Sequence, residues 1–160
     1  PVISYNYGAG NSGKMREYFH YSMFTIAWSS LAIFFISYLG NGFFVDLFSK
    51  EQEVVAIAAP ALRLFAYGFL FMGINVFAGS LFTAVCNGKI SAIISLLRSL
   101  VFVVMGIYLL PQTPLGTGGI WLTVPFAELA TFVVTLFYLY RCRRTYYPPH
   151  QHKHGFSHIR

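Results

Sequence analysis

The stretch LRLFAYGFLFMGINVFAGSLFTAVC, Leu62–Cys86, decides the fold of this chain. Its only charged residue is Arg63, at the start of the stretch. A helix rises by about 1.5 Å per residue, so this stretch is long enough to cross a hydrocarbon core of about 30 Å. We therefore predict that it is a transmembrane helix.

Small and polar residues fall on two sides of this predicted helix. The first set is Gly68, Asn75, Gly79 and Cys86, and the set roughly opposite is Ala66, Gly73, Ser80 and Ala84. Helices in a membrane approach each other through small residues. We therefore expect neighbouring helices on both sides of it.

The composition is that of a membrane protein. Of the 160 residues, 56% are hydrophobic and only 10% are charged. The net charge of +6 comes from basic residues beside apolar segments, which orientation and anionic lipid explain better than nucleic acid does. The chain starts at Pro1 without a signal-peptide pattern, so we expect it to begin inside a longer protein. Cys86 and Cys142 are too few for a disulfide framework and are expected to be free thiols.

An all-α membrane fold is predicted, with the end of one helix followed by four complete spans. The spans are expected at about residues 21–39, 62–86, 90–110 and 120–140. Together, residues 1–141 would form part of a six-helix bundle. Residues 142–160 are polar and His-rich, and we expect them to be a disordered cytoplasmic tail.

Local signals mark two interruptions. Ser49 is predicted to cap the helix that precedes residues 62–86 and that carries Glu51 and Glu53 in its first turn. Pro60 is expected to kink that helix, and Pro125 to interrupt the last span.

Four spans place both ends of the chain on one side of the membrane, and most basic residues collect there. They are Lys14, Arg16, Lys89, Arg141, Arg143, Arg144, Lys153 and Arg160. The other side has only Lys50 and, at the interface, Arg63. The positive-inside rule therefore predicts a multi-pass plasma-membrane protein with both ends in the cytoplasm.

Three glycines near the start, Gly8, Gly10 and Gly13, match the G-x-G-x-x-G dinucleotide fingerprint. That motif needs a strand before it, a helix after it and an acidic residue about 20 positions on. A membrane helix follows here instead, so we interpret the segment as a helix end that breaks into a glycine-rich turn.

Several segments together resemble the multidrug and toxic compound extrusion (MATE) transporters. Residues Pro1, Gly8, Ala9 and Asn11 are similar to a P-x-x-x-x-x-x-G-A-x-N motif, and residues 47–54 to an L-F-[ST]-x-[DE]-x-E-[VI] segment of that family. The segments ALRLF at 61–65 and GGIWL at 118–122, the latter followed by Pro125 and Glu128, also resemble family patterns.

The resemblance implies a transporter of two six-helix bundles, of which residues 1–141 would be most of the second. It implies export of drugs or other amphipathic cations in exchange for H⁺ or Na⁺ by alternating access. The expected partners are the bilayer, a small organic cation and the missing N-terminal half. Some members carry an acid in the helix that matches Leu62–Cys86. Here Asn75 is the nearest polar group, which leaves the missing half as a place for a coupling carboxylate.

Glu128 is the only acidic residue deep in a predicted span, which makes it a candidate for proton or substrate handling. Its helical face also carries Trp121, Val124, Thr131 and Thr135. The alternative, which we favour, is a structural ion pair with Arg98. Asn75 could bind an ion through its carbonyl oxygen, although a hydrogen bond to a neighbouring helix is commoner.

We find no enzyme motif and predict no cofactor, resident metal or nucleic-acid site. His150, His152, His154 and His158 lie in the expected disordered tail, which lacks the fixed geometry of a structural zinc site. Two other functions stay open. One is a lipid-linked sugar flippase of a related superfamily, and the other is a four-helix membrane scaffold without transport.

Overall fold

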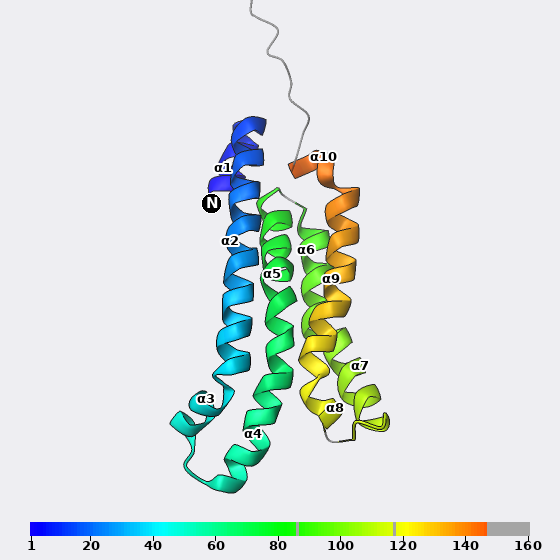
Figure 1. Cartoon of the computed structure of the whole chain (residues 1–160). Coiled ribbons are helices and arrows are strands. Elements are labelled where there is room, and N and C mark those ends of the chain that lie inside the picture. The colour runs from blue at the N-terminus through cyan, green and yellow to red at the C-terminus, as the bar shows by residue number, and fades with distance from the viewer. Residues whose placement is uncertain (86, 117, 147–160) are drawn as a thin grey trace, which may run out of the picture.

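The computed structural model describes residues 1–85, 87–116 and 118–146, and these residues form helices without any strand. Four helical stretches are long and apolar enough to cross a membrane: Ser12–Leu39, Gln52–Ala84, Gly88–Gln112 and Thr123–Arg141. They stand side by side as a bundle (Figure 1). The prediction of an all-α membrane fold is confirmed.

The elements in chain order are α1 (Val2–Gly8), α2 (Ser12–Leu39), α3 (Asn41–Phe48), α4 (Gln52–Phe65), the 3₁₀ turn η1 (Ala66–Gly68), α5 (Phe69–Ala84), α6 (Gly88–Leu96), the π-helical segment η2 (Leu97–Val101), α7 (Phe102–Leu109), the 3₁₀ turn η3 (Leu110–Gln112), α8 (Gly118–Trp121), α9 (Thr123–Arg141) and α10 (Arg143–Tyr146). The stretches α4–η1–α5 and α6–η2–α7–η3 each form one long span.

Helix α5 is the centre of the bundle, where it packs against α2, α6 and α9. Its small residues allow this close approach. Gly73 faces α2, Gly79 faces α6, and Gly68, just before α5, faces α9. The expectation that the stretch Leu62–Cys86 has neighbours on both sides is confirmed for the described residues; Cys86 itself lies outside them.

The first span is longer than predicted. Helix α2 begins at Ser12, not near residue 21, and residues 14–20 are its first turns. The side-chain oxygen of Asn11 accepts a hydrogen bond from the Lys14 N–H at 3.3 Å, which satisfies one of the unpaired amides at the helix start. Met15 is buried in the bundle, so packing also stabilises this early start.

The predicted cap at Ser49 is wrong. Ser49 has an extended backbone, and its hydroxyl accepts a hydrogen bond from the Glu51 N–H at 3.3 Å. It lies three residues before α4 begins at Gln52, and Glu51 is the N-cap instead of a first-turn residue. Glu53 does lie in the first helical turn, as predicted. Pro60 lies inside α4. The departure from α-helical geometry comes after it, at η1, where Ala66 and Gly68 are buried.

The last span also begins differently from the prediction. A turn at Leu122 separates α8 from α9, and α9 begins at Thr123. Pro125 therefore sits in the first turn of α9 instead of interrupting a helix. A helix leaves its first four N–H groups without partners inside the helix, so a residue that lacks an N–H fits there at little cost.

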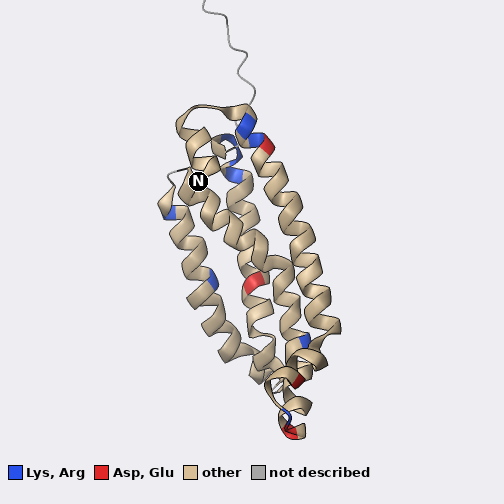
Figure 2. Cartoon of the chain, turned by 90° about the vertical axis from the view of Figure 1, so that its left-hand side faces the viewer, with Lys and Arg blue, Asp and Glu red and all other residues tan. Residues whose placement is uncertain are grey.

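An apolar core joins the helices at the end of the bundle where both ends of the described chain lie (Figure 1). Phe82 and Leu81 of α5 and Ile94 of α6 are almost fully buried in it. Figure 2 shows that charged residues gather mainly at the two ends of the bundle, as expected for a protein whose middle lies in lipid.

The start of the expected disordered tail is ordered instead. Arg143–Tyr146 form α10, and the Tyr146 hydroxyl donates to the Leu139 carbonyl at 2.6 Å. Its ring stacks on Phe19 at 5.1 Å between centroids, so an aromatic pocket holds the segment. Burial of this phenol raises the pKa of Tyr146, and the nearby Cys142 adds to the increase. The rest of the predicted tail, 147–160, including its histidines, lies outside the described residues.

Helix α5 offers a matched pair of glycines that tests this packing. A Cβ at Gly73 would lie 2.6 Å from the Ser30 hydroxyl oxygen and 2.8 Å from an Ile26 methyl, whereas a Cβ at Gly79 has no neighbour closer than 3.9 Å. We expect Gly73→Ala to lower the free energy of unfolding by about 1–3 kcal/mol because the site is overpacked. Gly79→Ala should be neutral or slightly stabilising, since alanine favours a helix.

The measurement is thermal unfolding of both variants in detergent micelles. Equal melting temperatures for the two variants would contradict the close contact between α5 and α2.

Candidate functional site

Glu128 lies on the buried face of α9, in the middle of the bundle. Only 3% of its surface is exposed, and Thr131 and Thr135, one and two turns further on, are fully buried. The predicted polar stripe therefore exists from Glu128 onward. Trp121 does not belong to it, because it lies on the separate helix α8 and is exposed.

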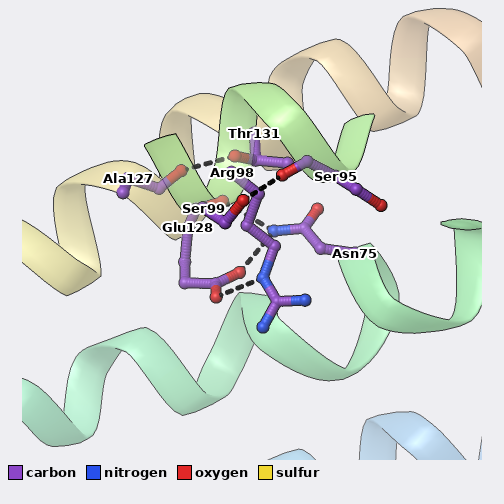
Figure 3. Close-up of polar contacts among 7 residues, drawn as sticks. All are labelled: Asn75, Ser95, Arg98, Ser99, Ala127, Glu128 and Thr131. Atoms are coloured by element: carbon purple, nitrogen blue, oxygen red, sulfur yellow. Dashed lines mark hydrogen bonds and ion pairs between the residues drawn. The ribbon is translucent and has the colours of Figure 1, made fainter. Parts of the chain in front are cut away.

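Arg98, Glu128 and Asn75 meet at one point, from η2, α9 and α5 (Figure 3). Arg98 Nε donates to Glu128 Oε1 at 2.7 Å. Asn75 Nδ2 donates to Glu128 Oε2 at 2.8 Å and to the Glu128 backbone carbonyl at 2.9 Å. Each oxygen of the Glu128 carboxylate thus has a hydrogen-bond donor. The favoured prediction, that Arg98 and Glu128 form an ion pair, is confirmed.

Asn75 bonds across to a neighbouring helix, as the sequence led us to expect. It is only 1% exposed. Its amide oxygen, Oδ1, is buried and has no partner among the described residues. A buried acceptor without a hydrogen-bond donor is unusual in a native protein and requires a structural or functional explanation.

Arg98 occupies the π-helical segment η2, which joins α6 to α7. The hydroxyl of the next residue, Ser99, donates a hydrogen bond to the Ser95 carbonyl at 2.7 Å. Short π-helical segments are rare and often occur at functional sites, because they shift the direction of the side chains that follow. The segment was not predicted, since no residue type in 97–101 signals a π-helical turn.

A polar cleft of about 590 Å³ opens beside this cluster, between α5 and the α6–η2 stretch, with α1 at one side. Hydroxyl groups line much of it. The Thr83 and Ser91 hydroxyl oxygens are 2.8 Å apart, and both groups bond to the Gly79 carbonyl. Arg98 and Asn75 also line the cleft. Ser91 and Ser95 are four residues apart, so a shared helical face follows from the sequence, but the cleft depends on how α5 and α6 pack.

A second hollow, of about 450 Å³, lies between α3 and α4 near Trp121 at the opposite end of the bundle. Its lining residues are apolar except for Ser49. Binding sites need a few placed polar groups to orient a ligand. We therefore centre the candidate site on the Arg98, Glu128 and Asn75 cluster.

The glycine-rich motif near the start has no part in this cluster. Pro1 precedes α1, which ends at Gly8, and Ala9 and Gly10 form the turn before Asn11 caps α2. Gly10 has a positive φ of 66°, a conformation that glycine adopts easily. The interpretation of a helix end and a glycine turn is confirmed, and no strand of a dinucleotide fold occurs in the described chain.

Four membrane-length helices around a buried acid–base pair define a multi-pass membrane protein. The family model MatE matches residues 1–109, more than half of the chain, so the protein belongs to the MatE family. No curated protein and no solved structure matches the chain. Members of this family are membrane transporters and not enzymes. Asn75 and Arg98 lie within the matched residues, and Glu128 lies beyond them.

A double-mutant cycle measures how much the Arg98–Glu128 ion pair contributes to the free energy of unfolding. Glu128→Gln strands the Arg98 charge, and Arg98→Gln strands the Glu128 charge. Each single change should therefore lower the free energy of unfolding by about 3 kcal/mol. In the double variant neither charge is stranded, so most of the loss should be recovered.

The readout is denaturant unfolding in mixed micelles. Strictly additive losses in the double variant would mean that the two side chains do not interact in the folded protein.

Proposed function

We propose that this chain is most of the second bundle of a secondary antiporter, which exports amphipathic organic cations in exchange for H⁺ or Na⁺ by alternating access. Membership of a transporter family supports the proposal. So does the polar cleft that reaches a charged cluster inside a bundle of membrane-length helices. Transporter sites of this kind usually lie near the middle of the membrane, between repeats.

The observation that carries the proposal is the buried and fully paired carboxylate of Glu128. Ionisable residues inside a membrane are costly and commonly mark ion or substrate pathways. Because Arg98 balances the charge of Glu128, a proton or cation at this carboxylate competes with Arg98. Its arrival would loosen the link between α9 and η2, while Asn75 keeps α5 bound to the Glu128 carbonyl.

This competition gives the three residues distinct proposed roles. Glu128 accepts the proton or faces the cation, Arg98 is the internal counter-charge, and Asn75 ties α5 to the site. An unpaired coupling carboxylate would lie in the other half of the transporter. No second function is favoured, since among the described residues Arg98 is the only basic side chain at the buried cluster and Arg63 packs on the Tyr38 ring, which gives little support for a lipid-linked sugar flippase.

Transport can be tested in everted membrane vesicles that contain the full-length protein. An imposed H⁺ or Na⁺ gradient should drive uptake of a fluorescent lipophilic cation, and Glu128→Gln should reduce the rate at least tenfold because the site then cannot exchange a proton. Asp46→Asn is the matched control. It makes the same change from acid to amide on an exposed residue of α3 and should leave the rate unchanged.

Normal uptake by a well-expressed Glu128→Gln variant would restrict Glu128 to a structural role. Absence of uptake by the unmodified protein under both gradients would contradict the antiport proposal itself.

We further propose a plasma-membrane location with both ends of the chain in the cytoplasm. Basic residues support this orientation, because Lys14, Arg16, Arg141, Arg143 and Arg144 are all near the end of the bundle that holds α1 and α10. The opposite end mixes basic with acidic residues (Figure 2). Such an excess of Lys and Arg marks the cytoplasmic side.

Cysteine labelling checks the orientation. With Cys86 and Cys142 replaced by serine, new cysteines at the exposed positions Lys50 and Thr145 should react with an impermeant maleimide from opposite sides. Lys50→Cys should label in intact cells, and Thr145→Cys only after the cells are opened. Labelling of both positions in intact cells would contradict this topology.

A further inference from the structure

The polar cleft between α5 and α6–η2 has an unexpected charge. Among the described residues that line it, Arg98 is the only one with a charged side chain. Glu128 does not reach its surface and is covered by Arg98 and Asn75. A ligand in the cleft therefore meets the positive member of the ion pair and not the negative one.

Arg98 uses only part of its guanidinium group in the ion pair. Its Nε bonds to Glu128, but its two terminal nitrogens have no hydrogen-bond partner among the described residues. In Figure 3 these nitrogens point away from the Glu128 carboxylate. The side chain is 32% exposed. The four N–H groups of these nitrogens thus have no partner among the described residues, and the two that point along the end of the planar fork match a carboxylate in two parallel hydrogen bonds.

Further groups around the cleft are suited to a polar ligand. Ser80 and Ser95 line the cleft, are exposed, and have no bond from their hydroxyls to the described residues. Asn75 Oδ1, at the buried side, lacks a donor. Because that oxygen is buried, the groups that the cleft itself offers are the Arg98 N–H donors and the hydroxyl groups, which suit an anion.

We propose that the outward face of Arg98 is a subsite for the carboxylate of an exported amphiphile that also carries a protonated amine. The proposal rests on the transport function given above and narrows its substrate class. A carboxylate has one negative charge, so the Glu128 carboxylate beside Arg98 repels it less than it would repel a doubly charged group. A doubly charged phosphate would be repelled by that same Glu128.

The depth of Arg98 favours a substrate over a lipid headgroup. Arg98 lies ten residues into the helix that starts at Gly88, or about 15 Å along its axis. This is near the middle of a hydrocarbon core of about 30 Å, whereas lipid phosphates stay at its boundary. A substrate inside the transporter can reach this depth through the cleft.

A rhodamine methyl ester and the same rhodamine as the free acid provide matched probes, since both carry the cation and only the acid carries the carboxylate. Fluorescence anisotropy with the purified full-length protein should give a Kd for the acid about tenfold lower than for the ester, the effect of one added charge-assisted hydrogen-bonded pair. Arg98→Lys keeps the charge beside Glu128 but loses the fork. It should bring the Kd ratio close to one.

Arg63→Lys is the control, because Arg63 stacks on the Tyr38 ring and does not line the cleft. It should keep the tenfold ratio.

Equal Kd values of acid and ester for the unmodified protein would overturn the subsite, while gradient-driven uptake of the ester would still support the transporter. The reverse result, a tenfold preference without any uptake, would contradict transport and leave the subsite standing. A copurified anionic lipid that is lost in Arg98→Lys, with the acid-to-ester ratio unchanged, would assign the fork to a lipid phosphate and overturn the proposal.

Discussion

The structure depends on the need to neutralise one carboxylate inside the membrane. Glu128 is almost completely removed from solvent, and a carboxylate in such a place is costly unless it is paired and hydrogen-bonded. Arg98 supplies the charge and Asn75 supplies a donor. Since these three residues belong to η2, α9 and α5, the requirement of one side chain fixes how three helices lie against one another.

Close packing around α5 makes that arrangement possible. In lipid, apolar surface does not drive helices together as it does in water, so contact depends on how closely their backbones approach. Gly68, Gly73 and Gly79 give α5 three close neighbours without bulky side chains between them. This brings Asn75, midway along the helix, within hydrogen-bond distance of Glu128.

The same cluster supports the transport proposed above. Its two charges cancel, so the bundle tolerates them at its centre, yet Arg98 presents unused donors to an open polar cleft. The π-helical segment that carries Arg98 interrupts the regular backbone beside this cleft. In the antiport proposed above, a proton or cation that competes with Arg98 for Glu128 would change the contacts between α9 and η2.

The sequence by itself determined the elements whose causes are local. The length and apolarity of Leu62–Cys86 imply a membrane span, because the hydrocarbon core demands about 20 apolar residues whatever the surroundings. The glycine turn after α1 follows from the conformations that glycine permits. The pairing of Arg98 with Glu128 was also predictable, since two isolated opposite charges in neighbouring spans have few other partners in lipid.

Tertiary structure decided what depends on distant contacts. Asn75 was a candidate site residue, but its partner Glu128 is 53 residues further along the chain. The hydrogen bond between them therefore required the packing of α5 against α9. Tyr146 orders a segment of tail-like composition because the ring of Phe19, far away in sequence, covers it. The cleft and the outward face of Arg98 arise from the spacing of α5 and α6 and from a π-helical turn. Local propensity specifies neither, because both are set by how the side chains of separate helices fit together.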